Sequence, residues 1–294
     1  MSTKLICVLG GTGFVGQNLV RNLCSHGVMV RLPTRSAYTA EHTFASLPVE
    51  VISADLHDLD QLINLFHGVD AIINLVGVLH ERGGETFQKV HVELPLKVIE
   101  AAKISGVSRL IHMSALNAAP DGKSSYLRTK GEAENLLRGS GLQVTLFRPS
   151  VIFGDGDSFL SLFGKLARWF PVLPLACADA KFQPVWVEDV AQALAQSLNA
   201  VASIGESFDL CGPQVYSLKK LVAFAASCCN KYPLIIPLPD KLAYLQAWLM
   251  ELMPTKLMTR DNFYSMHLDS VCNCDFPFEI LPTSLEEIAP QYIN

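Results

Sequence analysis

Short apolar runs alternate with helical patterns along the first half of the chain. Runs of β-branched and aliphatic residues predict six strands, at Lys4–Leu9, Val28–Leu32, Val49–Ser53, Ala71–Leu75, Arg109–Met113 and Gln143–Phe147. Apolar residues three and four positions apart predict helices between them, at Phe14–Ser25, Asp58–Phe66, Glu85–Ser105 and Ser125–Arg138. The strands are apolar throughout, which is typical of strands covered by helices on both faces. The pattern therefore predicts an α/β fold with a doubly wound parallel sheet.

The pattern changes after Pro149, where prolines become frequent and the connections lengthen. Further helices are predicted there, at Ser158–Trp169, Glu188–Asn199, Ser217–Ser227 and Lys241–Met253. We therefore expect the sheet domain to occupy residues 1–150. Residues 151–294 should form a smaller, mixed C-terminal domain for a substrate or partner, with some of its elements returning to the first sheet.

A glycine-rich turn joins the first predicted strand to the first predicted helix, with the sequence Gly10-Gly11-Thr12-Gly13-Phe14-Val15-Gly16. Glycine allows the chain to turn tightly, to approach a pyrophosphate closely and to pack the helix against the sheet. The helix N-terminus also directs backbone N–H groups toward an anion. The turn therefore predicts a Rossmann dinucleotide-binding domain, with cofactor contacts from Gly10, Thr12, Gly13, Phe14, Val15 and Gly16.

The end of the second predicted strand should lie beside the adenosine ribose of that cofactor. A carboxylate at this position favours a free 2′-hydroxyl, whereas an arginine accepts a 2′-phosphate. The chain has no acid here before Glu41 but carries Arg35, which predicts NADP(H) rather than NAD(H). The alternative is that Arg35 is only a solvated loop residue.

Two further strand ends should contact the cofactor. Asp55 and Leu56 follow the third predicted strand, where Asp55 can accept a hydrogen bond from the adenine amine. Asp58 is better explained as a helix N-cap, because Gln61 follows it by three residues. Val76 and Gly77 follow the fourth strand and should pass beneath the cofactor, but a simple strand-to-loop transition explains Gly77 equally well.

Tyr126 and Lys130 are four residues apart and should share one face of a predicted helix. Ser114 stands at the end of the fifth predicted strand, at the carboxyl edge where ligands bind in open α/β sheets. The three residues predict a catalytic site: Ser114 binds the substrate oxygen, Tyr126 transfers the proton, and Lys130 lowers the tyrosine pKa and holds the nicotinamide ribose. A second pair at this spacing, Tyr216 and Lys220, follows a Gly-Pro turn and is interpreted as coincidence.

Together these motifs resemble the extended or atypical short-chain dehydrogenase/reductases, and more narrowly the nucleotide-binding accessory subunits of respiratory complex I and their bacterial relatives. The resemblance rests on residues 10–16, 74–77, 90–93, 111–118, 126–130, 148–154 and 183–191, and is thin beyond Tyr216. It implies a Rossmann fold with a small substrate-side domain and bound NADP(H). In the accessory subunits the nucleotide is thought to serve structure or sensing rather than turnover. The chain departs from the pattern at His91, where extended enzymes usually carry Asn.

Two hypotheses about function follow. One is an NADP(H)-dependent oxidoreductase, or an epimerase/dehydratase, that transfers hydride to or from an apolar carbonyl, alcohol or quinone-like substrate. The other is a non-catalytic NADP(H)-binding accessory or assembly module that docks on a respiratory or membrane-associated partner. The chain carries no H-E-x-x-H motif, no G-x-S-x-G motif and no P-loop lysine, which disfavours other common enzyme classes.

Composition bears on location and partners. Half of the 294 residues are hydrophobic, yet the longest uncharged stretches, Leu5–Val20 and Val190–Gly205, fall short of the roughly 18 to 20 apolar residues of a membrane span. No signal-peptide pattern is present at the N-terminus, which predicts a cytoplasmic protein, with peripheral binding at the inner face of a membrane left open. The formal net charge of −5 and the absence of a basic run argue against nucleic acid as a partner.

The eight cysteines are scattered among apolar runs, so we expect reduced, buried thiols. Cys272 and Cys274 have the wrong spacing for a zinc knuckle and only His267 is near them in sequence, so no metal is expected.

The helix predicted at Lys241–Met253 is apolar on nearly every side. Leu242, Leu245, Leu249 and Leu252 form one stripe, and Tyr244, Trp248, Met250 and Met253 extend apolar surface beyond it. We therefore expect a non-polar surface for a lipid-like substrate, a membrane or a partner. The alternative is that the rest of the chain covers this helix completely.

Overall fold

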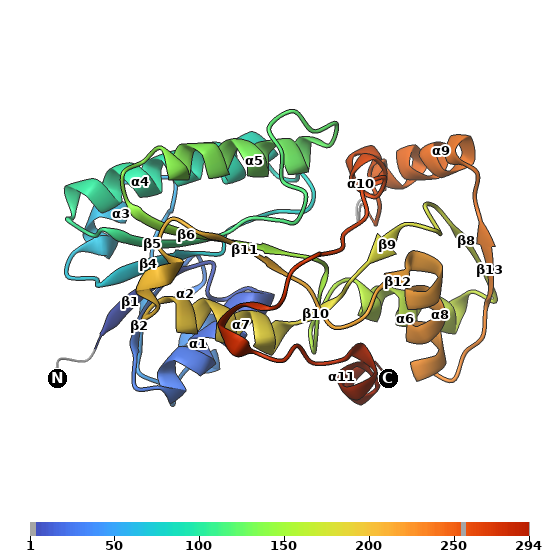
Figure 1. Ribbon diagram of the computed structural model, residues 1–294, viewed down its shortest axis with the longest axis horizontal. Coiled ribbons are helices and arrows are strands. Elements are labelled where there is room, and N and C mark those ends of the chain that lie inside the picture. The colour runs from blue at the N-terminus through green and yellow to red at the C-terminus, as the bar shows by residue number, and fades with distance from the viewer. Residues whose placement is uncertain (1–3, 254–256, 294) are drawn as a thin grey trace.

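A seven-stranded parallel sheet forms the centre of the protein. The computed structural model describes residues 4–253 and 257–293. The strand order is β11-β6-β5-β4-β1-β2-β3 (Figure 1), which is the doubly wound Rossmann arrangement with one strand added. The strands are β1 (Leu5–Leu9), β2 (Met29–Thr34), β3 (Val49–Ser53), β4 (Ala71–Asn74), β5 (Arg109–Met113), β6 (Gln143–Pro149) and β11 (Ser207–Leu210). The six strands expected from the sequence are confirmed.

Helices cover both faces of the sheet, as the apolar strands predicted. One face packs against α1 (Phe14–Ser25), α2 (Ala37–Thr43) and α7 (Val187–Ser197), and the other against α3 (Leu59–Phe66), α4 (Leu94–Ile104) and α5 (Ser125–Arg138) (Figure 1). Alternate side chains of β1 enter the two cores: Ile6 and Val8 pack toward α1, whereas Cys7 and Leu9 pack toward α3. Only α2 was not anticipated on these two faces.

One helix begins later than its sequence pattern suggested. The expected start at Glu85 is wrong, because Arg82 and Glu85 pair across a tight turn through Gly83 and Gly84. Both glycines have positive φ, which a helix cannot accommodate. A π-helical turn at Lys89–Glu93 then leads into α4, and π turns of this kind often occur at functional sites.

Most of the residues after Pro149 form the smaller part of the chain, which lies beyond the carboxyl ends of the strands of the central sheet (Figure 1). Its helices are α6 (Leu160–Trp169), α8 (Leu218–Cys228), α9 (Asp240–Glu251), α10 (Arg260–Ser265) and α11 (Leu285–Tyr292). Its strands form three pairs, β7 (Ile152–Phe153) with β10 (Val185–Trp186), β9 (Lys181–Phe182) with β12 (Tyr216–Ser217), and β8 (Val172–Leu175) with β13 (Leu234–Pro237). The four helices expected after Pro149 are present, while α10, α11 and the short strands were not anticipated.

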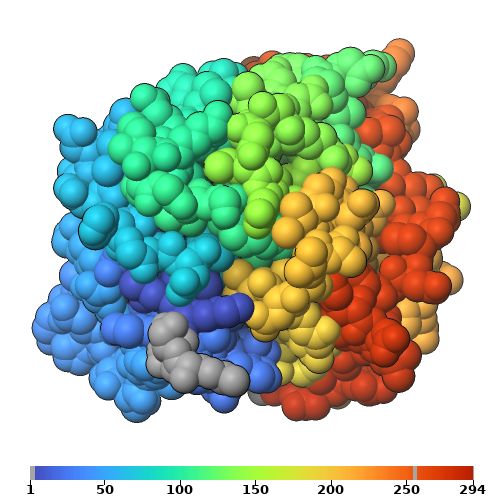
Figure 2. All heavy atoms as spheres, turned by 60° about the vertical axis from the view of Figure 1, so that its left-hand side comes forward, coloured from blue at the N-terminus to red at the C-terminus, as the bar shows by residue number. Residues whose placement is uncertain are grey.

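Segments far apart in the sequence share one surface. Figure 2 shows residues near 200 between the N-terminal part of the chain and the C-terminal segment. Strand β11 pairs with β6, and the Lys4 ammonium donates to the Asn199 side chain at 2.6 Å. Residues after Pro149 therefore complete the first sheet. Among the described residues, no helix has the length and apolar character needed to cross a membrane.

The expectation of reduced cysteines is wrong at one pair. Cys211, which follows β11, and Cys272, which lies between α10 and α11, form a disulfide across a separation of 61 residues. The contact exists because the C-terminal segment crosses the end of β11, which sequence spacing does not reveal. Among the described residues, six cysteines are free, and of these Cys7 and Cys24 are buried as expected.

Candidate nucleotide-binding and active site

The glycine-rich turn forms a close-fitting cradle at the start of α1. Gly10 has a φ of +79°, and a Cβ there would lie 3.2 Å from the backbone of residues 75 and 76. A Cβ at Gly16 would lie only 2.3 Å from the carbonyl oxygen of Gly10, so the helix could not approach the turn. Helix α1 has no acidic residue in its first turn and no side-chain cap, which leaves its N-terminal N–H groups available to an anion.

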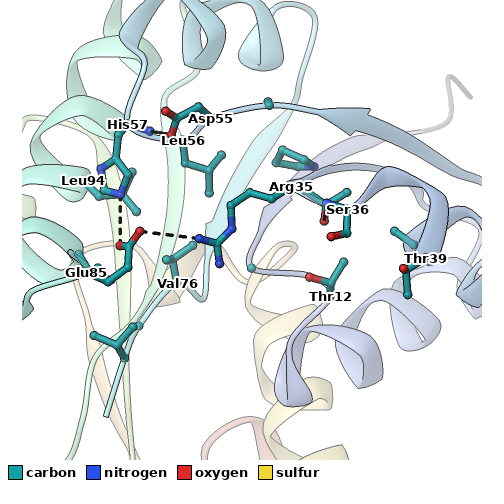
Figure 3. Close-up of a pocket in the computed structure, with 18 of the residues that line it drawn as sticks. Thr12, Arg35, Ser36, Thr39, Asp55, Leu56, His57, Val76, Glu85 and Leu94 are labelled. Atoms are coloured by element: carbon teal, nitrogen blue, oxygen red, sulfur yellow. Dashed lines mark hydrogen bonds and ion pairs between the residues drawn. The ribbon is translucent and has the colours of Figure 1, made fainter. Parts of the chain in front are cut away.

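A cavity of about 480 Å³ lies beside this turn (Figure 3). It opens between the ends of β1 and β4, where the strand order reverses and α/β proteins bind their ligands. Seven of the residues expected to bind the cofactor line it together, namely Gly10, Thr12, Arg35, Asp55, Leu56, Val76 and Gly77. Gly13, Phe14, Val15 and Gly16 lie at the adjoining turn and first helical residues. The shape and glycine cradle fit a dinucleotide.

Arg35 points across the cavity at a carboxylate that the sequence did not identify. Its guanidinium, 86% exposed, lies 3.7 Å from Glu85, and Glu85 also lies 3.6 Å from the His57 ring and 4.0 Å from the Lys89 ammonium (Figure 3). Glu85 reaches this position because the turn through Gly83 and Gly84 brings it over the cavity. An acidic group therefore faces the arginine that was expected to bind a phosphate.

The two aspartates after β3 have different surroundings. Asp58 accepts hydrogen bonds from the amides of Asp60 and Gln61, so its assignment as an N-cap is confirmed. The hydrogen bond from the Gln61 side chain, with those amides, lowers the pKa of Asp58. Asp55 accepts from the His57 amide at 2.9 Å and remains exposed at the cavity wall. Asp55 can thus still meet an adenine amine.

A buried polar cluster lies beneath Gly77, on the side of α5. A Cβ at Gly77 would lie 3.3 Å from the Lys130 ammonium and 3.6 Å from Nε2 of His91. Lys130 donates to the carbonyl oxygen of Met113 at 3.0 Å, and burial lowers its pKa to about 8. Lys130 therefore stands directly under the cavity floor with a single protein acceptor among the described residues.

His91, which replaces the usual Asn, is held neutral in this cluster. Its Nε2 accepts from the Val78 amide at 3.1 Å, so the proton resides on Nδ1, which lies 3.1 Å from the Thr129 hydroxyl. Burial, followed by the charge of Lys130, lowers the pKa of His91 to about 2. The histidine sits in the π-helical turn and fixes the loop at Val78 to helix α5.

A second buried histidine, His112, was not identified from the sequence. Neither ring nitrogen of His112, on β5, has a hydrogen-bond partner among the described residues. Burial and the nearby Lys130 charge hold the pKa of His112 well below its usual value. Both histidines are therefore neutral, and Lys130 is the cationic group of the cluster.

Tyr126 packs above this cluster, at the first turn of α5. Its ring meets those of His91 and Phe87 edge-on, with centroid separations of 5.4 Å and 5.9 Å. The expectation that Lys130 lowers the pKa of Tyr126 is wrong. Burial, together with the charge of Asp261, raises the pKa of Tyr126 to about 12.

The Ser114 hydroxyl does not join this pair. It is 3% exposed and donates to the Glu134 carboxylate at 2.5 Å, and Glu134 is also paired with Arg148. The Ser114 hydroxyl is thus bonded to a buried ion pair, and its contact with a substrate oxygen stays a prediction from the sequence. Nothing in the sequence indicates the bond to this ion pair, because Glu134 and Arg148 lie far from Ser114 along the chain.

The second tyrosine–lysine pair lies elsewhere. Tyr216 begins β12 in the smaller part of the chain, and its hydroxyl donates to the Glu286 carboxylate at 2.7 Å. Neither Tyr216 nor Lys220 lines the cavity.

Comparison with known proteins places the chain in a family. Residues 6–211 match the NAD dependent epimerase/dehydratase family. The chain belongs to this family. The matched residues include the glycine cradle, the cavity and the Tyr126–Lys130 helix, and the family binds a nicotinamide dinucleotide.

Two relatives that are similar over most of the chain bear names with different functions. The chain is 30% identical over 300 residues to mouse (Mus musculus) NADH dehydrogenase (ubiquinone) 1 alpha subcomplex subunit 9, mitochondrial, covering 97% of this chain and 78% of that protein. It is 31% identical over 239 residues to ceramide reductase of Caulobacter vibrioides, covering 80% of this chain and 74% of that protein. The chain is thus similar both to a subunit of NADH dehydrogenase (ubiquinone) and to a ceramide reductase.

Solved structures agree on the fold. A nucleoside-diphosphate-sugar epimerase from Staphylococcus aureus superposes with a TM-score of 0.77 at 16% identity, covering 97% of this chain and 98% of that one. The UDP-glucose 4-epimerase of Thermus thermophilus in complex with NAD gives 0.67 at 18% identity, covering 88% and 98%. At these identities the likeness concerns the fold alone.

Proposed function

We propose that the protein is an NADP(H)-dependent reductase that acts on an apolar carbonyl compound. The observation that carries this proposal is the arrangement on α5, where Tyr126 and Lys130 lie one turn apart. The Lys130 ammonium lies close to Gly77 at the cavity wall, and the Tyr126 ring packs against His91. The cofactor supplies the hydride, and the described residues supply its binding site and the proton.

The pKa of Tyr126 determines the protonation state in which this residue would meet a substrate. With a pKa of about 12 the phenol is protonated at neutral pH, so it is suited to donate a proton to a carbonyl oxygen as hydride arrives at the carbon. Lys130 would hold the nicotinamide ribose through its ammonium. Ser114 has no role in this scheme, because its hydroxyl is bonded to Glu134.

The preference for NADP(H) rests on Arg35. The end of β2 carries no carboxylate, and the Arg35 guanidinium is exposed at the cavity rim with only Glu85 as its ion-pair partner among the described residues. A 2′-phosphate can compete with Glu85 for Arg35, because an Arg–phosphate contact is charge-assisted and often bidentate.

Turnover tests the reductase directly. The protein should oxidise NADPH in the presence of long-chain ketones, keto-lipids or quinones, followed by the loss of nicotinamide absorbance. Binding of NADPH with no oxidation by any compound of these three classes would overturn catalysis and favour an accessory role.

A second candidate function, docking at a membrane, is favoured by one feature. Trp248 and Met253 are 42% and 49% exposed, so the alternative that the chain covers α9 completely is wrong. The apolar end surface comprises exposed residues of α9 and of the β8–β13 pair with their flanks: Trp169, Phe170, Val172, Tyr232, Leu234, Ile236, Leu242, Tyr244, Leu245, Trp248, Leu249, Leu252 and Met253. These elements lie together at one end of the molecule (Figure 1).

The charges around this apolar end surface suit an anionic lipid surface. Residues 159–175 and 228–253 carry the basic side chains Lys165, Arg168, Lys231 and Lys241 but only Asp240 and Glu251 as acids. Glu251 is already paired with Arg260 at 2.8 Å, whereas the whole chain is acidic with a net charge of −5. Tryptophan and tyrosine beside basic residues are typical of interfacial membrane binding.

Vesicle flotation tests this docking. The protein should float with vesicles containing phosphatidylglycerol, and Trp248→Glu with Leu249→Glu should abolish flotation. Val201→Glu, which changes an exposed apolar residue near the sheet edge, serves as the matched control and should float normally. Absence of flotation for the unmodified protein would overturn this function without affecting the reductase.

A further inference from the structure

Four metal-ligating side chains from two distant segments meet at the end of β11. Asp209 and Cys211 come from the end of this edge strand, and Cys272 and Cys274 from the segment between α10 and α11. The ligand atoms of Asp209, Cys272 and Cys274 all lie within 4.8 Å of one another. The sulfur of Cys211 is bonded to that of Cys272, so it belongs to the same cluster.

This donor set is one that zinc uses. Zinc binds cysteine sulfur at about 2.3 Å in tetrahedral sites, which places two ligand sulfurs about 3.8 Å apart. The ligand atoms of Asp209, Cys272 and Cys274 already lie within 4.8 Å of one another, which is near this spacing. Three thiolates and one carboxylate complete four ligands, without the histidine whose absence argued against a metal site in the sequence.

We propose that the reduced protein binds one zinc ion through Cys211, Cys272, Cys274 and Asp209, and that the Cys211–Cys272 disulfide is the alternative, oxidised state of the same cluster. A dithiol reductant supplies two electrons and two protons and becomes a cyclic disulfide, while Cys211 and Cys272 become thiols. Zinc then binds the three sulfurs as thiolates and releases their three protons.

The charges around the cluster support a cation. The Asp209 and Asp275 carboxylates both interact electrostatically with the Cys274 thiol, so negative charge faces the cluster. Arg148, at 4.0 Å from Asp209, is directed mainly to Glu134 by two hydrogen bonds. A zinc ion at the cluster would therefore offset negative charge that the protein leaves only partly neutralised.

The disulfide-bonded state and the zinc-bound state would both hold the same segment, which joins α10 to α11 and crosses the end of β11. The Cys272 amide donates to the Gln183 side chain at 2.9 Å, and the Ser150 hydroxyl donates to the Ser270 carbonyl at 2.8 Å. The segment continues from α10, whose Asp261 contacts the first turn of α5. The disulfide and the zinc site thus both hold the C-terminal region against the sheet, one under oxidising and one under reducing conditions.

Cobalt provides a spectroscopic test. Titration of the dithiol-reduced, full-length protein with Co²⁺ should give thiolate charge-transfer bands and the intense visible bands of tetrahedral cobalt, saturating at one equivalent and displaced by Zn²⁺. Cys274→Ser should weaken binding by at least about 100-fold, because even loss of outer contacts to a metal ligand lowers affinity 10–100-fold. Cys229→Ser, which changes another free cysteine that lies outside the cluster, is the matched control and should bind as the unmodified protein does.

Two results would overturn the proposal. One is the absence of thiolate charge-transfer bands when cobalt is added to the reduced, unmodified protein. The other is equal cobalt affinity of the reduced and the disulfide-bonded forms of the unmodified protein. NADPH binding by Cys274→Ser should be unchanged, so failure of the metal site and failure of the proposed reductase are distinguishable.

Discussion

The Asp261 carboxylate accepts a hydrogen bond from the backbone amide of Tyr126, although 135 residues separate them in the chain. The same carboxylate accepts from the Ser125 amide and the Ser124 hydroxyl, so helix α10 supplies the negative charge at the N-terminus of α5. Anions at helix N-termini are stabilising. The smaller part of the chain thereby positions the helix that carries Tyr126 and Lys130.

Replacing Asp261 should alter both stability and the tyrosine. Asp261→Asn keeps an oxygen acceptor but removes the charge, so the pKa of Tyr126 should fall below about 12 and the free energy of unfolding should decrease by roughly 1 kcal/mol. Alkaline difference absorbance, with Tyr126→Phe to identify the signal, measures the first effect, and thermal denaturation measures the second. Asp121→Asn, an exposed carboxylate in the loop before α5, should change neither. An unchanged Tyr126 pKa in Asp261→Asn would contradict the electrostatic link.

Cofactor preference should depend on the Arg35–Glu85 pair. The unmodified protein should bind NADPH at least tenfold more tightly than NADH, or about 1.4 kcal/mol, and Arg35→Ala should remove most of this difference. Glu85→Gln should strengthen NADPH binding several-fold, since Arg35 then loses the carboxylate that competes with a phosphate.

Calorimetric titration of both nucleotides measures these effects. Glu41→Gln removes a charge from nearby helix α2 without touching Arg35 and serves as the control. Equal affinities for NADPH and NADH in the unmodified protein would eliminate the assignment of NADP(H).

Tyr126 should be required for turnover but not for cofactor binding. Tyr126→Phe should abolish carbonyl reduction while changing the NADPH dissociation constant by less than about threefold, because only the hydroxyl that donates the proton is lost. Tyr216→Phe removes a hydroxyl that is bonded to Glu286 and should leave both properties unchanged. Full kcat in Tyr126→Phe, measured with any accepted substrate, would show that the proton comes from elsewhere.

Ser114 should matter for stability rather than catalysis. Ser114→Ala removes a hydrogen bond to the buried Glu134 carboxylate, which should lower the free energy of unfolding by roughly 1–3 kcal/mol. Turnover by the folded variant should remain within about twofold of normal. Ser25→Ala, at an exposed hydroxyl, should leave chemical denaturation unchanged. Normal stability combined with lost kcat in Ser114→Ala would restore the catalytic role that the sequence suggested.

The sequence predicted what depends on neighbouring residues. The strands, the glycine turn and the Asp58 cap each follow from a few consecutive residues whose backbone requirements are local. The directions of side chains inside the fold depend on distant partners. Ser114 was assigned to the substrate because of its place at a strand end, yet Glu134, one helix later, determines where its hydroxyl points.

The missed contacts all join distant segments. Glu85 reaches Arg35 only because of a glycine turn, and Cys211 reaches Cys272 only because the C-terminal segment crosses β11. The tyrosine pKa was predicted in the wrong direction for the same reason. Lys130 is its neighbour on the helix, but burial and Asp261 from another element dominate.

The return of β11 to the sheet limits how this protein can be divided. A fragment ending at residue 150 would retain the glycine cradle but would leave the backbone groups of β6 unpaired along one edge, and α1 would lose its contacts with α7. Exposed strand edges recruit other chains, so such a fragment should aggregate rather than fold as an isolated nucleotide-binding unit. During synthesis the seven-stranded sheet is therefore complete only after residue 210 has left the ribosome. The residues that bind the nucleotide then fold together with those that follow them.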